Sequence, residues 1–192
     1  MKKILSLIMI MLLMFGAMPL SFAATDNTNA TIIIAGDDRY ELYLNGNLIA
    51  SPAGPTYTDG QATSAGSPFR VKIDKGAYTI AVRGQDTAWH IAGVGMVILF
   101  DDGTVVNAGP SWKQFVNTSE TTIPGDWYTS SFDDSAWTAA FQIPNDRRDN
   151  NWKKTYSVGE TTSDLLWMWS QKFKQSDGAF DTDVYFRSEE RR

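Results

Sequence analysis

The sequence contains no cysteine and only one histidine, His90, among its 192 residues. Without cysteine the chain can form no disulfide bond and has no thiol for catalysis. A zinc site would need further histidine or cysteine ligands. A histidine-based triad would need a nucleophile in a context such as Gly-x-Ser-x-Gly, which the sequence lacks. Packing of apolar side chains, helped at most by a bound cation, must therefore stabilise the fold.

Positive charge is also in short supply, because 22 acidic residues outnumber 17 basic ones and give a formal net charge of −5. This balance argues against nucleic acid as a partner and is compatible with neutral glycans or with cations. Long apolar runs are missing beyond the first two dozen residues. We therefore expect no membrane span once the N-terminal leader described next has been removed.

Residues 1–23 have the features of an export signal. Lys2 and Lys3 form a short basic start, residues 4–14 are apolar, and small residues at the end provide a cleavage site. The apolar run is shorter than the roughly 20 residues that a membrane-spanning helix needs. Residues 24–192 suit one domain with a single core. The leader is of a bacterial type, so we expect a secreted, periplasmic or cell-surface protein.

Short strand signals separated by turn signals fill the mature chain, and no amphipathic helix longer than a turn or two is visible. The pair Asn45-Gly46 predicts a tight hairpin, because both residues tolerate positive φ. The apolar residues 93–100 predict a central strand covered on both faces. This spacing of short strands predicts an all-β sandwich. Further strands are predicted over residues 31–35, 40–44, 48–50, 69–73, 78–83, 104–106, 165–169 and 184–186.

All seven tryptophans lie in the mature chain, so large rings build the core. Trp89 and Trp152 have polar neighbours, and the pattern leaves open whether they pack in the core or face solvent on loops. Four other tryptophans are predicted to be buried: Trp112, Trp137, Trp167 and Trp169.

The order of these pieces resembles the galactose-binding-domain-like jelly roll. That fold occurs in carbohydrate-binding modules and in accessory domains of glycoside hydrolases. The resemblance implies one jelly-roll β-sandwich that binds carbohydrate and is not itself catalytic. It covers nearly all of the mature chain and rests on residues 38–46, 76–82, 93–100, 111–113, 127, 132–140, 166–170 and 184–187.

Adjacent acidic residues could be mistaken for a catalytic pair. Glycoside hydrolysis needs two carboxyl groups that face each other across a bond, at least about 5 Å apart. Neighbouring residues in a strand or turn point apart, so Asp133 and Asp134 are interpreted as turn residues, with the Trp137 ring beneath them. Asp101 and Asp102, before a glycine, are interpreted in the same way. We therefore expect no enzyme activity.

Asp37 and Asp38 are the exception among the acidic pairs. The resemblance implies a structural calcium ion near a strand end, held by carboxylate and backbone oxygens, which are the ligands that this ion prefers. These two residues are the candidate ligands. The resemblance suggests the ion, whereas the spacing of the residues does not show it.

Three polar segments carry an aromatic ring beside groups that can hydrogen-bond sugar hydroxyls. Sugar rings present apolar C–H faces that stack on Trp or Tyr, and flanking polar side chains bond the hydroxyls. The competing interpretation is that these rings pack in the core or between the sheets. The candidate ligand-binding residues are Asp86, Trp89, His90, Trp127, Tyr128, Arg147, Asp149 and Trp152.

Two functions remain. The first is an exported, non-catalytic module that recognises a glycan or polysaccharide through loop aromatics. The alternative is a structural or self-assembling subunit of a surface layer, filament or biofilm matrix, in which the same aromatics meet a neighbouring copy.

Overall fold

The computed structural model of the protein describes residues 29–51, 69–73, 76–87, 91–118, 121–148, 153, 155–174, 176 and 181–191. Nearly all regular structure in these ranges is β-strand, and the strand pairs are antiparallel. The prediction of an all-β fold is confirmed. No helix in these ranges is long and apolar enough to cross a bilayer.

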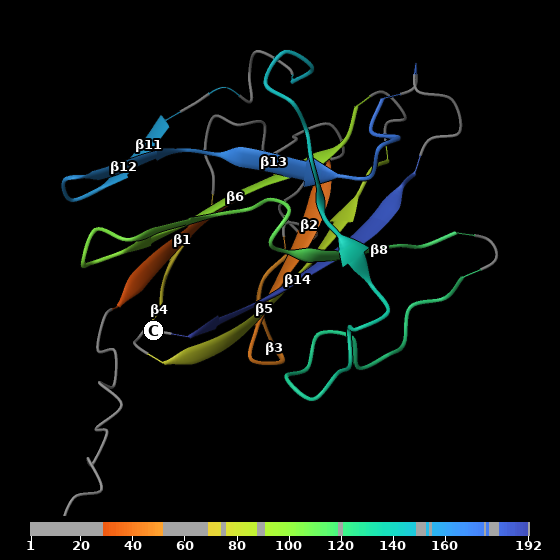
Figure 1. Ribbon diagram of the computed structural model, residues 1–192, viewed down its shortest axis with the longest axis horizontal. Helices are drawn as coiled ribbons and strands as arrows, with labels where there is room; N and C mark the ends of the chain where they lie inside the picture. The colour runs from red at the N-terminus through yellow and green to blue at the C-terminus, as the bar shows by residue number, and fades with distance from the viewer. Residues whose placement is uncertain are drawn as a thin grey trace, which may run out of the picture.

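The strands form two six-stranded sheets and one separate hairpin (Figure 1). The first sheet has the order β10 (Phe141–Gln142), β13 (Leu166–Trp169), β6 (Gly93–Phe100), β1 (Ala30–Asp37) and β4 (Phe69–Ile73), with β7 (Val105–Asn107) also paired to β6. The second sheet has the order β3 (Asn47–Ala50), β2 (Arg39–Leu44), β5 (Ala77–Gln85), β14 (Asp183–Arg191), β8 (Lys113–Val116) and β9 (Thr138–Ala139). The hairpin joins β11 (Thr155–Val158) to β12 (Thr161–Asp164).

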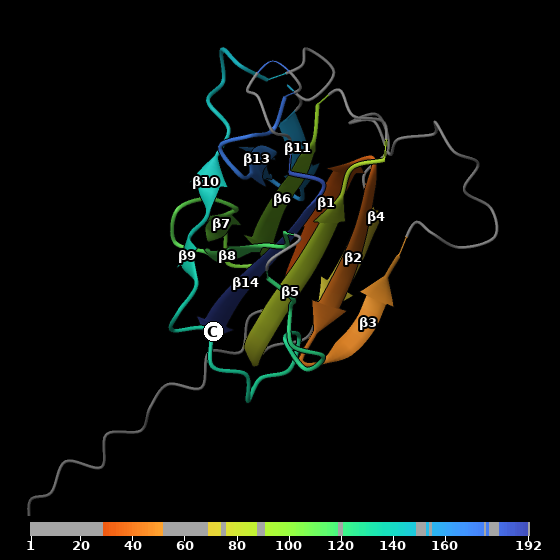
Figure 2. The same cartoon turned by 90° about the vertical axis from the view of Figure 1, so that its right-hand side faces the viewer.

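The two sheets lie face to face as two layers, in a sandwich-like arrangement with the main core between them (Figure 2). Alternation along the strands decides which side chains enter this core. Val184 and Phe186 of β14 belong to the core, whereas Tyr185 between them points to the outer face of the second sheet. All eight residues of β6 are buried, as predicted for a strand covered on both sides.

Turn chemistry sets the register of two hairpins. Asn45 and Gly46 both have positive φ, 49° and 82°, and connect β2 to β3. Asp102 Oδ1 accepts a hydrogen bond from the Thr104 backbone N–H at 2.8 Å, and Gly103 has a φ of 88°. Both predicted turns are confirmed.

The outer face of the second sheet carries a smaller aromatic cluster. Residues 121–137, which we call the covering segment, lie against this face and bring Trp127 and Trp137 onto the outward-facing Ala81 and Tyr185. Trp137 is therefore buried as predicted, but outside the main core. The other three tryptophans predicted to be buried lie in the main core: Trp112, Trp167 and Trp169.

Two strand glycines make room for the large rings of the main core. A Cβ atom on Gly84 of β5 would lie 2.4 Å from Cζ3 of Trp169, which belongs to the opposite sheet. A Cβ atom on Gly95 of β6 would lie 2.6 Å from Cε2 of Trp167, its partner on β13. Since neither indole can move without disturbing the packed core, these sites exclude any side chain.

We predict that Gly84→Ala destabilises the protein by about 2 kcal/mol, because the added methyl group overpacks the space that the Trp169 ring fills. Gly125→Ala is the matched control, since a Cβ atom there has no heavy atom within 4 Å. Its free energy of unfolding should stay within about 0.5 kcal/mol of the unchanged protein. Urea unfolding measures both, and equal stabilities would contradict the packing argument.

Candidate functional site

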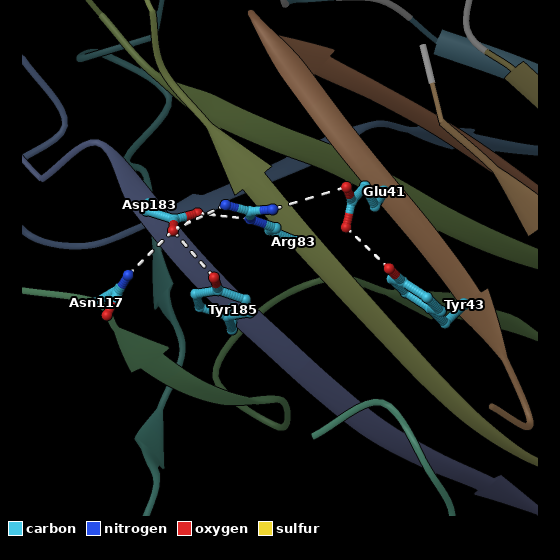
Figure 3. A network of polar contacts seen from close by, with 6 residues as sticks. All are labelled: Glu41, Tyr43, Arg83, Asn117, Asp183 and Tyr185. Atoms are coloured by element: carbon cyan, nitrogen blue, oxygen red, sulfur yellow. Dashed lines mark hydrogen bonds and ion pairs between the residues drawn. The ribbon is translucent and has the colours of Figure 1, made fainter. Parts of the chain in front are cut away.

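The outer face of the second sheet carries a connected set of polar side chains (Figure 3). Register places Glu41 of β2 opposite Arg83 of β5, and Arg83 opposite Tyr185 of β14. Because alternate residues share a face, Tyr43 and Asp183 project from the same side of the sheet. We call the following residues the Arg83 network: Glu41, Tyr43, Arg83, Asn117, Asp183 and Tyr185.

Arg83 is the centre of this network. Its Nε donates to Asp183 Oδ1 at 2.8 Å and its Nη2 donates to Asp183 Oδ2 at 3.1 Å, a two-point contact between guanidinium and carboxylate. Its Nη1 lies 3.7 Å from Glu41 Oε1. The hydrogen bonds to Asp183 raise the pKa of Arg83 above its ordinary value. One cation thus holds two carboxylates.

Neighbouring groups also donate to these carboxylates. Tyr43 OH donates to Glu41 Oε2 at 2.9 Å, and Tyr185 OH donates to Asp183 Oδ2 at 3.0 Å. Asn117 Nδ2 donates to the same Asp183 oxygen at 3.2 Å. Burial and the Glu41 carboxylate raise the pKa of Tyr43 to about 12. Burial, followed by the charge of Asp183, also raises the pKa of Tyr185. Both phenols therefore remain neutral donors at neutral pH.

The Arg83 network is accessible to solvent. The side chains of Glu41 and Arg83 are 29% and 27% exposed, and that of Asp183 is 15% exposed. Two carboxylates around one guanidinium leave one net negative charge, which disfavours an anionic ligand. The geometry offers fixed acceptors and donors on a sheet surface, which suits a neutral ligand with several hydroxyl groups.

An aromatic ring borders the network. Tyr128, from the covering segment, stacks on Tyr43 with ring centroids 4.6 Å apart and planes 13° from parallel. Tyr128 is half-buried, so part of it faces solvent. Trp127 is only 5% exposed and packs edge-on against Tyr43 and Tyr185. The exposed indole that the predicted stacking role of Trp127 requires is not found; Tyr128 is the accessible ring of the pair.

Arg187 of β14 holds the covering segment in place. Its side chain is fully buried, and its Nη1 donates to the backbone oxygens of Trp127 at 2.5 Å and Thr129 at 2.9 Å. Its Nε donates to Asp134 Oδ2 at 3.0 Å. The guanidinium carbon also lies 5.3 Å from the centre of the Phe132 ring. One side chain from the sheet therefore bonds both arms of the segment that carries Tyr128.

Asp133 and Asp134 each make a structural contact. Asp133 Oδ1 accepts a hydrogen bond from the Ser135 backbone N–H at 2.9 Å, which confirms its turn role. The same contact lowers the pKa of Asp133. Asp134 instead forms the ion pair with Arg187, a role that the sequence did not indicate.

Two of the other predicted ligand-binding residues, Asp86 and Arg147, lie in the described part of the chain and take no part in the Arg83 network. Asp86 follows β5 and is 5% exposed, and its backbone N–H donates to Thr182 O. The guanidinium carbon of Arg147 lies 4.5 Å from the centre of the Phe173 ring. Their roles remain predictions. Four predicted residues lie outside the described part of the chain: Trp89, His90, Asp149 and Trp152.

The calcium prediction also remains a prediction. Asp37 ends β1, and Asp38 Oδ2 accepts hydrogen bonds from Thr87 N at 2.7 Å and from Thr87 Oγ1 at 2.9 Å. These bonds connect the β1–β2 junction to the end of β5. Over the residues that the structure covers, no group of three or more acidic, histidine or cysteine side chains could hold a metal ion.

A scan of protein-family models and searches of curated proteins and of solved structures find no match to this chain. The architecture of two antiparallel sheets therefore stands on the structure alone, and the likeness to the galactose-binding-domain-like jelly roll remains a resemblance.

Sequence reasoning missed the Arg83 network, although one signal was available. The strand at residues 78–83 places Tyr78, Ile80 and Val82 on one face, so Arg83 had to lie on the other. Its partner Asp183 is 100 residues away along the chain, and no local pattern indicates that pairing.

We predict that Arg187→Met lowers the free energy of unfolding by about 3 kcal/mol, because it leaves the Asp134 carboxylate and two carbonyl oxygens without their donor. Glu189→Gln, an exposed change on the same strand, is the control and should have little effect. Guanidinium unfolding gives the stabilities. Acrylamide should also quench the tryptophan fluorescence more strongly in Arg187→Met than in the unchanged protein or in Glu189→Gln, because Trp127 loses its cover. Unchanged quenching would show that the covering segment does not need this anchor.

Proposed function

We propose that the protein is an exported, non-catalytic glycan-binding module, and that the Arg83 network with Tyr128 is its binding surface. The observation that carries this proposal is the position of a half-buried aromatic ring beside a solvent-accessible set of fixed polar groups. Sugars are recognised in this way: a ring stacks on a C–H face, and side chains of fixed geometry bond the hydroxyls.

Each component has a separate role in the proposed complex. Tyr128 supplies the stacking face, and its contact with Tyr43 fixes the orientation of the ring. Glu41 and Asp183 accept hydrogen bonds from sugar hydroxyls, while Arg83 donates to ring or hydroxyl oxygens. Arg83 neutralises one of the two carboxylates and leaves one net negative charge. A neutral glycan that covers the network therefore adds no further unpaired charge.

The excess of acidic over basic residues in the chain also favours a neutral glycan over an anionic one. A formal net charge of −5 disfavours polyanions over the surface as a whole, and the Arg83 network repeats that preference locally. The export signal expected from residues 1–23 would bring such a surface to extracellular polysaccharides.

We expect binding to be lost when Tyr128, the accessible ring beside the Arg83 network, is truncated. In a screen of immobilised neutral polysaccharides, the unchanged protein should be retained by at least one, and Tyr128→Ala should weaken that retention by about tenfold. Glu41→Gln should also weaken it, because a carboxylate accepts from hydroxyls more strongly than an amide.

Glu189→Gln is the matched control for Glu41→Gln, since both lie on the second sheet but Glu189 takes no part in the Arg83 network. Its retention should equal that of the unchanged protein. Melting temperatures must show that all variants are folded. Retention by no neutral polysaccharide, or equal retention of all variants, would refute the proposed surface.

A self-assembling subunit is the second candidate, and one observation favours it. Strand β3 lies at the edge of the second sheet, and its Leu48 and Ile49 are 54% and 36% exposed. An edge strand with exposed apolar side chains is a template for pairing with another chain. A neighbouring copy could extend the sheet there.

This second candidate predicts concentration-dependent association that Leu48→Lys abolishes, because a charge on an edge strand opposes strand pairing. Static light scattering at increasing concentration measures it. Lys72→Gln, at an exposed position of β4 in the other sheet, should leave association unchanged. A protein that stays monomeric at high concentration would exclude this function.

A further inference from the structure

Strand β3 forms one edge of the second sheet, and its side chains differ from those at the other sheet edges. It pairs with β2 and with no second strand in the described part of the chain. Leu48 and Ile49 are 54% and 36% exposed, and no other large apolar side chain is exposed in that part. None of the four residues of β3 carries a charge. An uncharged edge strand with exposed apolar side chains is open to pairing with another chain.

The other sheet edges are protected from pairing by charge or by length. β4, at the edge of the first sheet, carries the exposed side chains of Arg70 and Lys72. In an antiparallel pair of two β4 strands, Arg70 of one copy would face Lys72 of the other, and like charges directly opposite each other are destabilising. β9 and β10, at the two remaining edges, have two residues each. Charged and very short edge strands both oppose edge-to-edge pairing.

The hydrogen bonds of β2 determine which backbone groups of β3 face the free edge. The backbone N–H of Asn45, which follows β2, donates to Thr79 O at 2.9 Å, on the β5 side. Alternate residues direct their N–H and C=O groups to the same side of a strand, so those of Tyr43 also face β5. Leu48 lies opposite Tyr43, and its own groups therefore point away from β2, towards the free edge. Beyond Leu48 the register skips Ile49, and such an irregularity interrupts pairing, which leaves Leu48 as the centre of this edge.

Leu48 also lies on the same face of the sheet as the Arg83 network. Residues directly opposite each other in an antiparallel pair project to one face. Tyr43 projects to the outer face, where it stacks on Tyr128. The exposed side chain of Leu48 therefore borders the proposed binding surface. Figure 2 shows β3 at the edge of the sheet, beside β2.

We infer that β3 pairs in the antiparallel sense with β3 of a second copy of this chain, with Leu48 opposite Leu48 on a two-fold axis. At this centre the two residues exchange two backbone hydrogen bonds, and their side chains pack together on the outer face. The same edge serves both copies, so the assembly is complete at two chains and does not continue into a filament. Two four-residue strands bury less than the roughly 1,200–2,000 Å² of a stable interface, so the association is weak and depends on concentration.

This symmetry places both candidate binding surfaces on one side of the dimer. A two-fold axis between antiparallel strands is perpendicular to the sheet, so the outer faces of both copies point the same way. Five strand spacings of about 4.8 Å separate the two Arg83 residues, which amounts to about 24 Å across the strands. The next step rests on the proposed glycan-binding function: one polysaccharide chain contacts both Arg83 networks. The second contact is then intramolecular, and two weak sites together give strong retention on a polymer.

Because the chain contains no cysteine, a single introduced thiol tests the pairing. Leu48→Cys places two thiols opposite each other in the dimer, with a Cα separation of about 5.5 Å that a disulfide bond can bridge. Under mild oxidation of the purified protein, we expect Leu48→Cys to form a covalent dimer at least about tenfold faster than two control variants. Gel electrophoresis without reductant measures the rates.

The controls are Asn47→Cys, on the same strand, and Lys72→Cys, on the charged edge of the other sheet; all three positions are exposed. In the proposed pair, Asn47 faces Ile49 of the other copy, and the two Asn47 Cα atoms lie about 8 Å apart, too far for a disulfide bond. Equal rates for the three variants, or no covalent dimer of Leu48→Cys, would overturn the two-fold pair and leave this edge to a different partner.

Retention on a polysaccharide tests whether both surfaces act together. At low protein concentration, the covalent Leu48→Cys dimer should be retained at least about tenfold more strongly than the same variant after reduction, on an immobilised neutral polysaccharide that retains the unchanged protein. Equal retention of the two forms would overturn the placement of both surfaces on one face. Retention of neither form on any neutral polysaccharide would refute the glycan-binding step, whereas the cross-linking rates decide on the pair itself.

Discussion

The buried guanidinium of Arg187 is the contact on which the outer face of the second sheet depends. Arg187 projects from the outer face of β14 and is fully buried there. It donates hydrogen bonds to Trp127, Thr129 and Asp134 of the covering segment. A segment with little regular structure would otherwise have few bonds to hold it to the sheet. Because Arg187 donates to residues on both sides of the turn in this segment, Tyr128 is held in a fixed position against Tyr43.

Strand β14 links the core to the candidate site. Its inward residues Val184 and Phe186 pack between the sheets, and its outward residues Asp183 and Tyr185 join the Arg83 network. A shift of one residue in its register would exchange the two sets and bury a carboxylate. The hydrophobic pattern that stabilises the fold therefore also fixes the spacing of the polar groups. This coupling explains how strand packing can hold polar groups rigidly on an open sheet surface.

Local patterns predicted the strands and hairpins, because alternation and turn residues act over a few positions. The Asn45-Gly46 turn, the buried strand β6 and the burial of Trp167 and Trp169 were all recoverable in this way. The site was not, because its contacts join distant segments: Arg83 with Asp183, and Asp134 with Arg187 at a separation of 53 residues. Trp127 shows the same limit. The sequence left open whether it stacks on a sugar or packs against a sheet, and the structure buries it against the outer face of the second sheet.

Arg187 and Arg148 are two buried arginines whose charges are compensated to different degrees. Both are at least nine-tenths buried, and the Nη2 of each lacks an acceptor within the described residues. Arg187 nevertheless has its charge neutralised by Asp134 at 3.0 Å and makes three hydrogen bonds. Arg148 makes one, to Ile143, and no carboxylate in the described ranges lies within ion-pair distance of it. Desolvation is therefore compensated in the first case and largely uncompensated in the second. Burial alone therefore does not decide what an arginine contributes to the fold; its counter-charge and its hydrogen-bond acceptors do.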